Sequence, residues 1–344
     1  MEYLYAYLTF LAQAITVVVA ILVVLAAIAN VSSRRQTVRK GHLEIEKIND
    51  RLEDLGMRIR EAVLPAAAFK KEAKQRRQAH KKADKHPEKE QADGGGEKKR
   101  IFVLGFEGDL PATHVSQLRR EVDAVLTEAR ETDEVVVKVE SPGGMVHGYG
   151  LAASQLHRLR SGRIPLTVAV DKVAASGGYL MAAVANHVIA APFAVIGSIG
   201  VVAQVPNVHR LLKKNDVDVE VLTAGRYKRT LTVFGENTEE GRAKFIEELE
   251  DTHRLFQEFV SEHRPQVDMD VVATGETWYG QRAVDVKLVD EVATSDQYLL
   301  DRAGEADIYE LRWVEQKKPI ERLLGQAEAA FARMAQFFKV REGI

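Results

Sequence analysis

The 344-residue sequence contains no cysteine. This absence excludes a disulfide framework, a cysteine nucleophile, and zinc or iron–sulfur sites with cysteine ligands. It does not fix the compartment, since a cysteine-free chain survives on either side of a membrane. Hydrophobic residues make up 46% and charged residues 28% of the chain, which excludes wholesale disorder. The length predicts about two domains.

Charged residues are missing from positions 3–33. This apolar run exceeds the roughly 20 residues that span the ~30 Å hydrocarbon core of a bilayer. We predict a transmembrane anchor over residues 1–30, embedded through residues 3–30. A cleaved signal peptide ending at Ala27-Ile28-Ala29 is the alternative, but the start lacks a positively charged segment and the run is longer than a signal peptide's apolar core.

The net charge of −2 is unevenly distributed. Residues 31–100 hold 20 Lys and Arg against 12 Asp and Glu, which leaves −9 on residues 101–344. A basic arm without a fold to shape it does not indicate a nucleic-acid binder, so we expect no nucleic-acid partner. Arg34 and Arg35 directly follow the anchor, and the positive-inside rule places them in the cytoplasm. That rule weakens before a long domain, so the side on which the body lies stays open.

The segment between anchor and body has two parts. Residues 31–69 predict an amphipathic helical segment, because apolar residues recur there at spacings of three and four: Ile45, Ile48, Leu52, Leu55 and Ile59. This helix either forms a coiled coil of about two heptads or packs on its own chain, and Pro65 ends it. Residues 70–100 have almost no apolar side chains and predict a charged flexible linker.

The body is predicted over residues 101–315. Short β-branched runs alternate with helical segments, a pattern that indicates α/β layers with parallel strands. The predicted strands lie at 101–106, 134–140, 165–170, 187–191 and 219–222. The predicted helices lie at 113–130, 148–160, from 176, at 207–215 and at 238–263, the last burying Phe245, Leu249, Leu255, Phe256 and Phe259.

Two further apolar segments need an interpretation. Residues 179–205 could be mistaken for a second membrane span, but they contain Asn186, His187 and Pro192, and we interpret them as buried core. Residues 316–344 predict a C-terminal amphipathic helix. It packs on the body or, alternatively, contacts another subunit or the membrane surface.

Glycine-bearing turns follow several of the predicted strands. Ser141-Pro142-Gly143-Gly144 allows a backbone N–H to face a substrate oxygen, as an oxyanion hole requires. Ser176-Gly177-Gly178 places a serine between a strand and an apolar helix. The motif G-x-S-x-G is absent, so Ser176 is either a nucleophile or an ordinary helix N-cap. Two more turns lie at residues 197–200 and 225–229.

A serine nucleophile needs a base. His147 or His187, oriented by Asp171, would form a triad, although their surroundings do not resemble a Ser-His-Asp protease. Lysine is the other candidate, provided that burial lowers its pKa from ~10.4 to roughly 7–8. Lys228 is one such lysine among many, and its spacing alone does not distinguish it from a solvated surface charge.

Taken together, the motifs resemble the signal peptide peptidase A (SppA) family of serine proteases, most closely its SohB branch of bacterial inner-membrane proteins. The matching segments occur in family order: ESPGGMVHGYGLA at 140–152, VDKVAASGGYLMAAVA at 170–185, GSIGVV at 197–202, AGRYKRTLTVFGENTEEGR at 224–242 and TGETWYGQRAVDVKLVDEV at 274–292. The order of anchor, basic helix and linker is also similar. Lys287 departs from the pattern, since many relatives have glycine there.

The resemblance implies an α/β, ClpP/crotonase-like stack of β-β-α units and a Ser–Lys dyad. Ser176 matches the nucleophile and Lys228 the general base. Gly143, with Gly177, matches the oxyanion hole, and Ser198 matches a hydroxyl that orients the lysine. No cofactor or metal is implied.

The resemblance also sets expectations about context. It implies a single-pass protein of the bacterial inner membrane that forms homo-oligomers, in which neighbouring protomers can supply the serine and the lysine. Expected substrates are peptides or unfolded polypeptides, including signal-peptide remnants and membrane-protein fragments. The better-known members act on the extracytoplasmic face, contrary to the positive-inside rule. Two alternatives remain, a crotonase-like acyl-CoA enzyme and a non-catalytic membrane scaffold that keeps the protease fold.

Overall fold

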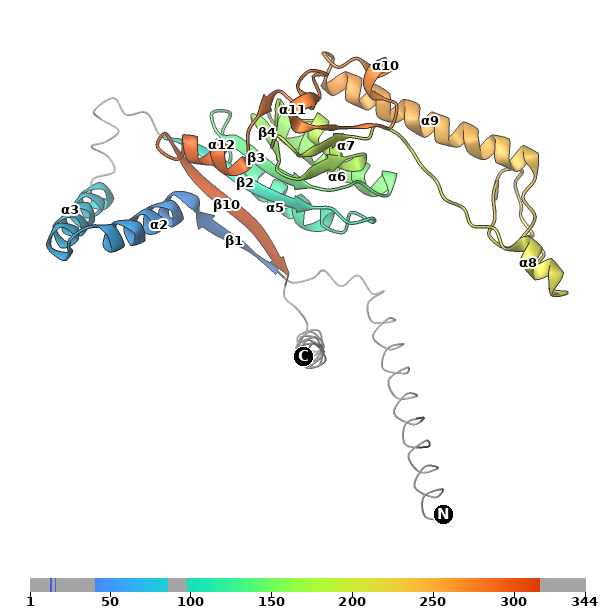
Figure 1. Ribbon diagram of the computed structural model, residues 1–344, viewed down its shortest axis with the longest axis horizontal. Coiled ribbons are helices and arrows are strands. Elements are labelled where there is room, and N and C mark those ends of the chain that lie inside the picture. Colours follow the sequence, from blue (N-terminus) through green and yellow to red (C-terminus); the bar gives the residue numbers. More distant parts are fainter. Residues whose placement is uncertain (1–12, 14–15, 17–40, 86–97, 316–344) are drawn as a thin grey trace, which may run out of the picture. The chain divides into compact units, whose positions relative to one another are not determined.

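The computed structural model describes residues 13, 16, 41–85 and 98–315 (Figure 1). The predicted anchor, apart from positions 13 and 16, lies outside the described residues, as does the predicted C-terminal helix at 316–344. Within the described ranges, no helix is long and apolar enough to cross a membrane.

The main sheet has the strand order β1-β10-β2-β3-β4-β6-β9. All pairings from β10 to β9 are parallel. The strands are β1 (Gly41–Lys47), β2 (Lys99–Glu107), β3 (Glu134–Glu140), β4 (Leu166–Val170), β6 (His187–Ala190), β9 (Glu291–Val292) and β10 (Ala306–Glu315). Four strands predicted from β-branched runs are confirmed as β2, β3, β4 and β6. The strand predicted at 219–222 is wrong: this segment is irregular and exposed, so its alternating valines have no layer to pack against.

The central strands of the main sheet, β2, β3, β4 and β6, are buried on both faces, as expected for a parallel sheet between two helical layers. In β2, Leu104 and Phe106 belong to one hydrophobic cluster, whereas Ile101 and Val103 belong to another. The first cluster includes residues of α5 (Val115–Glu128), α6 (Val146–Ser161) and α7 (Gly177–Ala183). The second includes residues of α2 (Ile48–Val63) and α12 (Ser295–Arg302). This layering confirms the α/β class.

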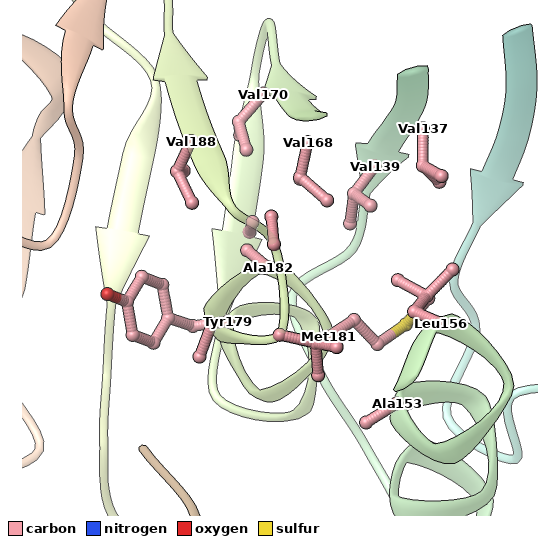
Figure 2. Packing of buried hydrophobic residues seen from close by; sticks show 14 of the residues in the cluster. Val137, Val139, Ala153, Leu156, Val168, Val170, Tyr179, Met181, Ala182 and Val188 are labelled. Atoms are coloured by element: carbon pink, nitrogen blue, oxygen red, sulfur yellow. The ribbon is translucent and has the colours of Figure 1, made fainter. Parts of the chain in front are cut away.

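Figure 2 shows the first cluster from close by. Met181 and Ala182 of α7, with Leu156 of α6, lie beneath the valines of the sheet, which are Val137, Val139, Val168, Val170 and Val188. The apolar stretch after Tyr179 is thus divided among α7, β6 and β7 (Val195–Gly197), each too short to cross a membrane. Its interpretation as buried core is confirmed for most residues through Ile199, but Asn186, Pro192 and Phe193 are exposed, as are residues 202–205.

A second, smaller sheet lies beside the first. Its order is β5-β7-β8, with β5 (Val173–Ala175) parallel to β7 and β8 (Thr277–Tyr279) antiparallel to β7. Ser141, directly after β3, forms a parallel bridge to Ala174. The two sheets are therefore joined where β3 ends.

The long helix α9 (Glu239–His263) is packed less extensively than its sequence predicts. The Thr238 side chain accepts a hydrogen bond from the Gly241 N–H at 3.0 Å and caps its start. Phe256 and Phe259 pack against the first cluster, but Leu255 is 60% exposed, and the fully buried residues lie only in the last turn. The predicted buried face is therefore confirmed for the C-terminal part of the helix alone. The remaining short helices are α8 (His209–Lys214), α10 (Met269–Val272) and α11 (Gly280–Ala283).

The N-terminal segment differs from its prediction in two places. Residues 41–47, expected to be helical, form the edge strand β1, so the sheet extends beyond the predicted body. Residues 70–85, expected to belong to a flexible linker, continue α3 (Ala66–Lys85), because alanine, lysine and glutamine favour a helix even without an apolar face. In α2, Ile48 and Leu52 pack on the same chain. Leu55 and Ile59 are exposed, so packing on the chain accounts for only part of the predicted stripe.

Candidate active site

Three parallel segments end at the same edge and bring three of the four glycine-bearing turns together. Ser141 pairs with Ala174, and Ala175 of β5 pairs with Gly197 of β7. Since the carboxyl ends of parallel strands meet at one edge, the residues that follow each segment become neighbours. These are the turns that begin at Pro142, Ser176 and Ser198.

Ser176 has a backbone conformation that is unusual for a residue with a side chain. Its φ is 51° and its ψ is −121°, which corresponds to the first central position of a type II′ turn, normally occupied by glycine. Such a conformation costs about 1–3 kcal/mol and persists only where surrounding contacts impose it. Here the Ser176 N–H donates to the Gly197 carbonyl at 2.8 Å, and its carbonyl accepts from the Leu180 N–H at 3.0 Å. The side chain makes no capping hydrogen bond to α7, so Ser176 is not an ordinary N-cap.

The predicted oxyanion residues lie directly against Ser176. A β-carbon added to Gly143 would lie 2.7 Å from the Ser176 Cβ and 2.8 Å from the Gly177 nitrogen. Gly143 also has a φ of +91°, so only glycine fits this turn without strain. The structure therefore places Gly143, Ser176 and Gly177 together.

The hydrogen bonds of this turn refine that prediction. The Gly143 N–H already donates to the Ser141 Oγ at 3.0 Å. In the described part of the chain, the N–H groups of Gly144 and Gly177 have no protein acceptor. Gly144 was not among the predicted site residues, and only its place in the Pro-Gly-Gly turn indicated it.

Ser198 lies one residue beyond the acceptor of the Ser176 N–H. It has a φ of +52°, and its N–H donates to the Glu276 carbonyl at 2.6 Å. Gly197 before it has a φ of +98° and packs against Trp278 of β8. Strand β8 of the second sheet thus supports the turn that carries Ser198, and this turn lies beside the turn of Ser176.

Lys228 is not brought to Ser176 within the single chain. It lies in the segment 201–237, which we call the arm and in which only Gly235 is buried. The Lys228 side chain is exposed, and its N–H donates to the Gly225 carbonyl at 3.1 Å. Among the described residues, no hydrogen bond or ion pair joins it to Ser176.

The triad alternative finds no support in the contacts of its members. His187 lies at the start of β6 and faces Glu291 at 3.2 Å. Asp171 accepts hydrogen bonds from the N–H and Oγ of Ser295, at 2.7 and 2.6 Å. His147 is exposed at the start of α6. No group of three or more His, Asp or Glu in the described ranges is arranged to hold a metal ion.

Lys287 stands where the family resemblance implies glycine, and its backbone conformation accounts for that expectation. Its φ is +62°, a left-handed conformation in which glycine carries no steric penalty. Its carbonyl accepts a hydrogen bond from Arg264 at 2.9 Å. The turn is therefore the one that glycine would form, with lysine accommodated in it.

Two family models cover nearly all of the body and the segment before it. Peptidase family S49 N-terminal matches residues 2–156, and Peptidase family S49 matches residues 158–308. The chain belongs to peptidase family S49. The resemblance inferred from the glycine-bearing motifs is confirmed at the level of the family.

Curated relatives agree with the S49 assignment. The chain is 46% identical over 350 residues to the "Probable protease SohB" of Haemophilus influenzae, covering 99% of this chain and 98% of the relative. It is 58% identical over 202 residues to the "Probable protease SohB" of Buchnera aphidicola subsp. Schlechtendalia chinensis, covering 59% and 66% of the two chains. Among solved structures, a variant of the 1510-N membrane-bound stomatin-specific protease in complex with a substrate peptide covers 67% of this chain and 98% of its own, with 12% identity and a TM-score of 0.41.

Proposed function

We propose that this S49 peptidase is a membrane-anchored serine endopeptidase that uses Ser176 as its nucleophile and Lys228 as its general base. The observation that carries the proposal is the strained Ser176 backbone at the N-terminus of α7, with Gly143 packed against it. A strained, uncapped serine beside free backbone N–H groups is typical of a nucleophile held at the end of a strand.

The chemistry follows from these positions. The Ser176 hydroxyl attacks a peptide carbonyl while neutral Lys228 takes its proton. The N–H groups of the two glycine turns donate to the oxyanion, each contributing roughly 3–4 kcal/mol in comparable sites. Gly177 and Gly144 have N–H groups available for this, whereas the Gly143 N–H is engaged with Ser141. Protonated Lys228 then donates to the leaving amine, and a water activated by the same lysine hydrolyses the acyl-enzyme.

A second copy of the chain completes the dyad in this proposal. The arm exposes large apolar side chains that a monomer would not leave in water, namely Val202, Val205, Leu211, Val217, Val219, Val221, Leu222, Tyr227 and Phe234. A lysine base needs a desolvated environment, and Lys228 is exposed in the single chain. Packing of the arm on a neighbouring protomer would cover both the apolar side chains and Lys228, as the predicted homo-oligomer requires. Ser198 of that protomer would then orient the lysine.

The finer features of fold and context belong to the same proposal. The body is a ClpP/crotonase-like stack of β-β-α units. Residues 1–30 anchor it in the bacterial inner membrane as a single pass, and its substrates are peptides or unstructured polypeptides such as membrane-protein fragments. The strained serine favours a nucleophile over the two alternatives, because a crotonase-like acyl-CoA enzyme needs no such serine and a non-catalytic scaffold has no reason to keep it.

The test is peptide cleavage by the purified full-length protein in detergent, using casein and a short apolar fluorogenic peptide. Ser176→Ala and Lys228→Ala are each expected to lower turnover at least about 1,000-fold, as loss of a nucleophile or base does. Circular dichroism should show both variants folded. Full activity of Ser176→Ala would overturn the assignment, and hydration of an acyl-CoA without peptide cleavage would favour the crotonase alternative.

A further inference from the structure

Tyr149 of α6 lies between the two glycine-bearing motifs, although its place in the sequence gives it no obvious role. It is fully buried. A β-carbon added to Gly177 would lie 2.3 Å from the Tyr149 Cγ, and one added to Gly144 would lie 2.8 Å from its Cε2. One aromatic ring thus occupies the space left by a glycine in each motif.

The hydroxyl of Tyr149 belongs to a hydrogen-bond chain with one consistent direction. The Tyr149 hydroxyl donates to the Asp109 carbonyl at 2.9 Å, and it lies 2.5 Å from the Ser141 Oγ. A phenol has a single proton, so in the second contact Ser141 is the donor. The Ser141 Oγ in turn accepts the Gly143 N–H at 3.0 Å. The chain therefore runs from the Gly143 N–H through Ser141 and Tyr149 to Asp109.

Both ends of this chain are fixed. The Asp109 carboxylate accepts hydrogen bonds from the N–H and Oγ1 of Thr113, at 2.7 and 2.8 Å, and holds the loop that presents its carbonyl. Burial raises the pKa of Tyr149, so the phenol keeps its proton at neutral pH. Gly108 leaves the room that the chain needs, since a β-carbon there would lie 2.1 Å from the Ser141 Oγ and 2.3 Å from the Tyr149 hydroxyl.

We propose that Tyr149 and Ser141 are positioning residues that hold the Gly143-Gly144 turn against Ser176, so that the Gly144 N–H faces the developing oxyanion. The proposal rests on the proposed function, because it assigns a role within that same site. Engaging the Gly143 N–H removes it as a donor to substrate and orients the next peptide. A shift of about 1 Å in such a donor is enough to lower the rate by about 100-fold.

Tyr149→Phe tests this role, because it keeps the ring between Gly144 and Gly177 and removes only the hydroxyl. We expect kcat to fall about 10- to 100-fold with KM changed less than about twofold, since the loss concerns a donor used in the transition state. Ser141→Ala should act in the same direction. The matched control is Tyr298→Phe. Tyr298 lies on α12, and its buried hydroxyl donates to Glu134 of β3 at 2.6 Å. This variant should lower the melting temperature comparably and leave kcat unchanged.

Hydrogen exchange at Gly143 and Gly144, followed by NMR, gives a readout that does not depend on turnover. Exchange at Gly143 should accelerate at least about 10-fold in Tyr149→Phe, since the Ser141 hydroxyl that accepts its N–H is no longer held by Tyr149, and it should stay unchanged in Tyr298→Phe. Equal exchange in the two variants would overturn the positioning role whether or not the protein cleaves peptides. Accelerated exchange with unchanged kcat would also overturn it. Absence of cleavage by the wild type would instead refute the proposed function, and the role with it.

Discussion

At the scale of the residue, Ser176 combines a reactive side chain with a backbone that only glycine adopts without strain. We expect Ser176→Gly to be more stable than Ser176→Ala by about 1 kcal/mol, because glycine relieves about 1–3 kcal/mol of strain and loses up to about 1 kcal/mol to the entropy of the unfolded chain. Both variants lack the hydroxyl, so the comparison isolates the backbone. Thermal unfolding in the same detergent should show the glycine variant melting about 2–4 °C higher. Equal melting temperatures would mean that the strain at a φ of 51° does not exceed the entropy cost of glycine, about 1 kcal/mol.

Where strand ends decide position, the sequence indicates which residues become neighbours. Ser176, Gly143 and Ser198 each follow a β-branched run, and parallel pairing makes them neighbours. The sequence does not show that the Gly144 N–H is available while the Gly143 N–H is not, because this depends on whether the Ser141 hydroxyl accepts the Gly143 N–H. The role of the Tyr149 ring was equally hidden, since it is set by the space between two glycines from different motifs.

At the scale of the element, the end of α9 is held by an ion pair between the buried Arg264 and Asp290, whose side chain is 27% exposed. Arg264 is 1% exposed and donates to both carboxylate oxygens of Asp290, at 3.0 and 2.7 Å. Asp290 also accepts the Val188 N–H of β6 at 2.7 Å. Burial raises the pKa of Asp290, but these hydrogen bonds outweigh it and leave the pKa below its usual value. The pair thus joins α9 to the main sheet.

We expect Asp290→Asn to destabilise the protein by about 3 kcal/mol or more, because it leaves Arg264 buried without a counter-charge. The folded-state pKa of Asp290 is lowered, so its contribution is full above the unfolded value of ~3.9 and is lost as pH falls through the folded value. Denaturant unfolding should therefore show a gap between wild type and variant that is constant above about pH 5 and narrows in more acidic buffer.

Asp296→Asn is the matched control, because Asp296 is 93% exposed and lies 3.6 Å from Lys138. An exposed pair contributes at most about 1 kcal/mol, so this variant should resemble the wild type at every pH. A similar loss in both variants would show that the pair of Arg264 and Asp290 does not hold α9. At this scale the sequence predicted α9 well but not its anchoring, because charge patterns do not show which arginine is buried.

At the scale of the whole molecule, the arm and the exposed part of α9 predict that the active form contains several copies. A site built from Ser176 of one protomer and Lys228 of another can be reconstituted by mixing two inactive variants. Random mixing of equal amounts of Ser176→Ala and Lys228→Ala should restore about one quarter of wild-type activity. At each heterologous interface, one protomer supplies an intact serine in about half of the cases, and its neighbour independently supplies an intact lysine in about half.

The control mixes Lys228→Ala with the double variant Ser176→Ala/Lys228→Ala, which should remain inactive. Activity is measured after the subunits have been unfolded together and refolded, so that they exchange. Complete inactivity of the first mixture, with full recovery of refolded wild type, would place both residues of the dyad in one chain.

Fold class and family could be read from the sequence, since five motifs in order and alternating strands and helices determine both. The conformation of residues 201–237 could not be read in the same way. The apolar pattern at Val219 and Val221 predicted a strand, but a strand needs a surface to cover, and the single chain offers none there.

The edge strand β1 has a consequence for how the protein holds together. Asn49, just after it, donates to the carbonyls of Ala303 and Ala306 and accepts the Ile308 N–H, at 2.8, 2.9 and 2.7 Å. Ile48 beside it is 4% exposed within the second cluster. If a protease cut the chain anywhere between residues 86 and 97, the two fragments would therefore remain bound to each other until a denaturant was added.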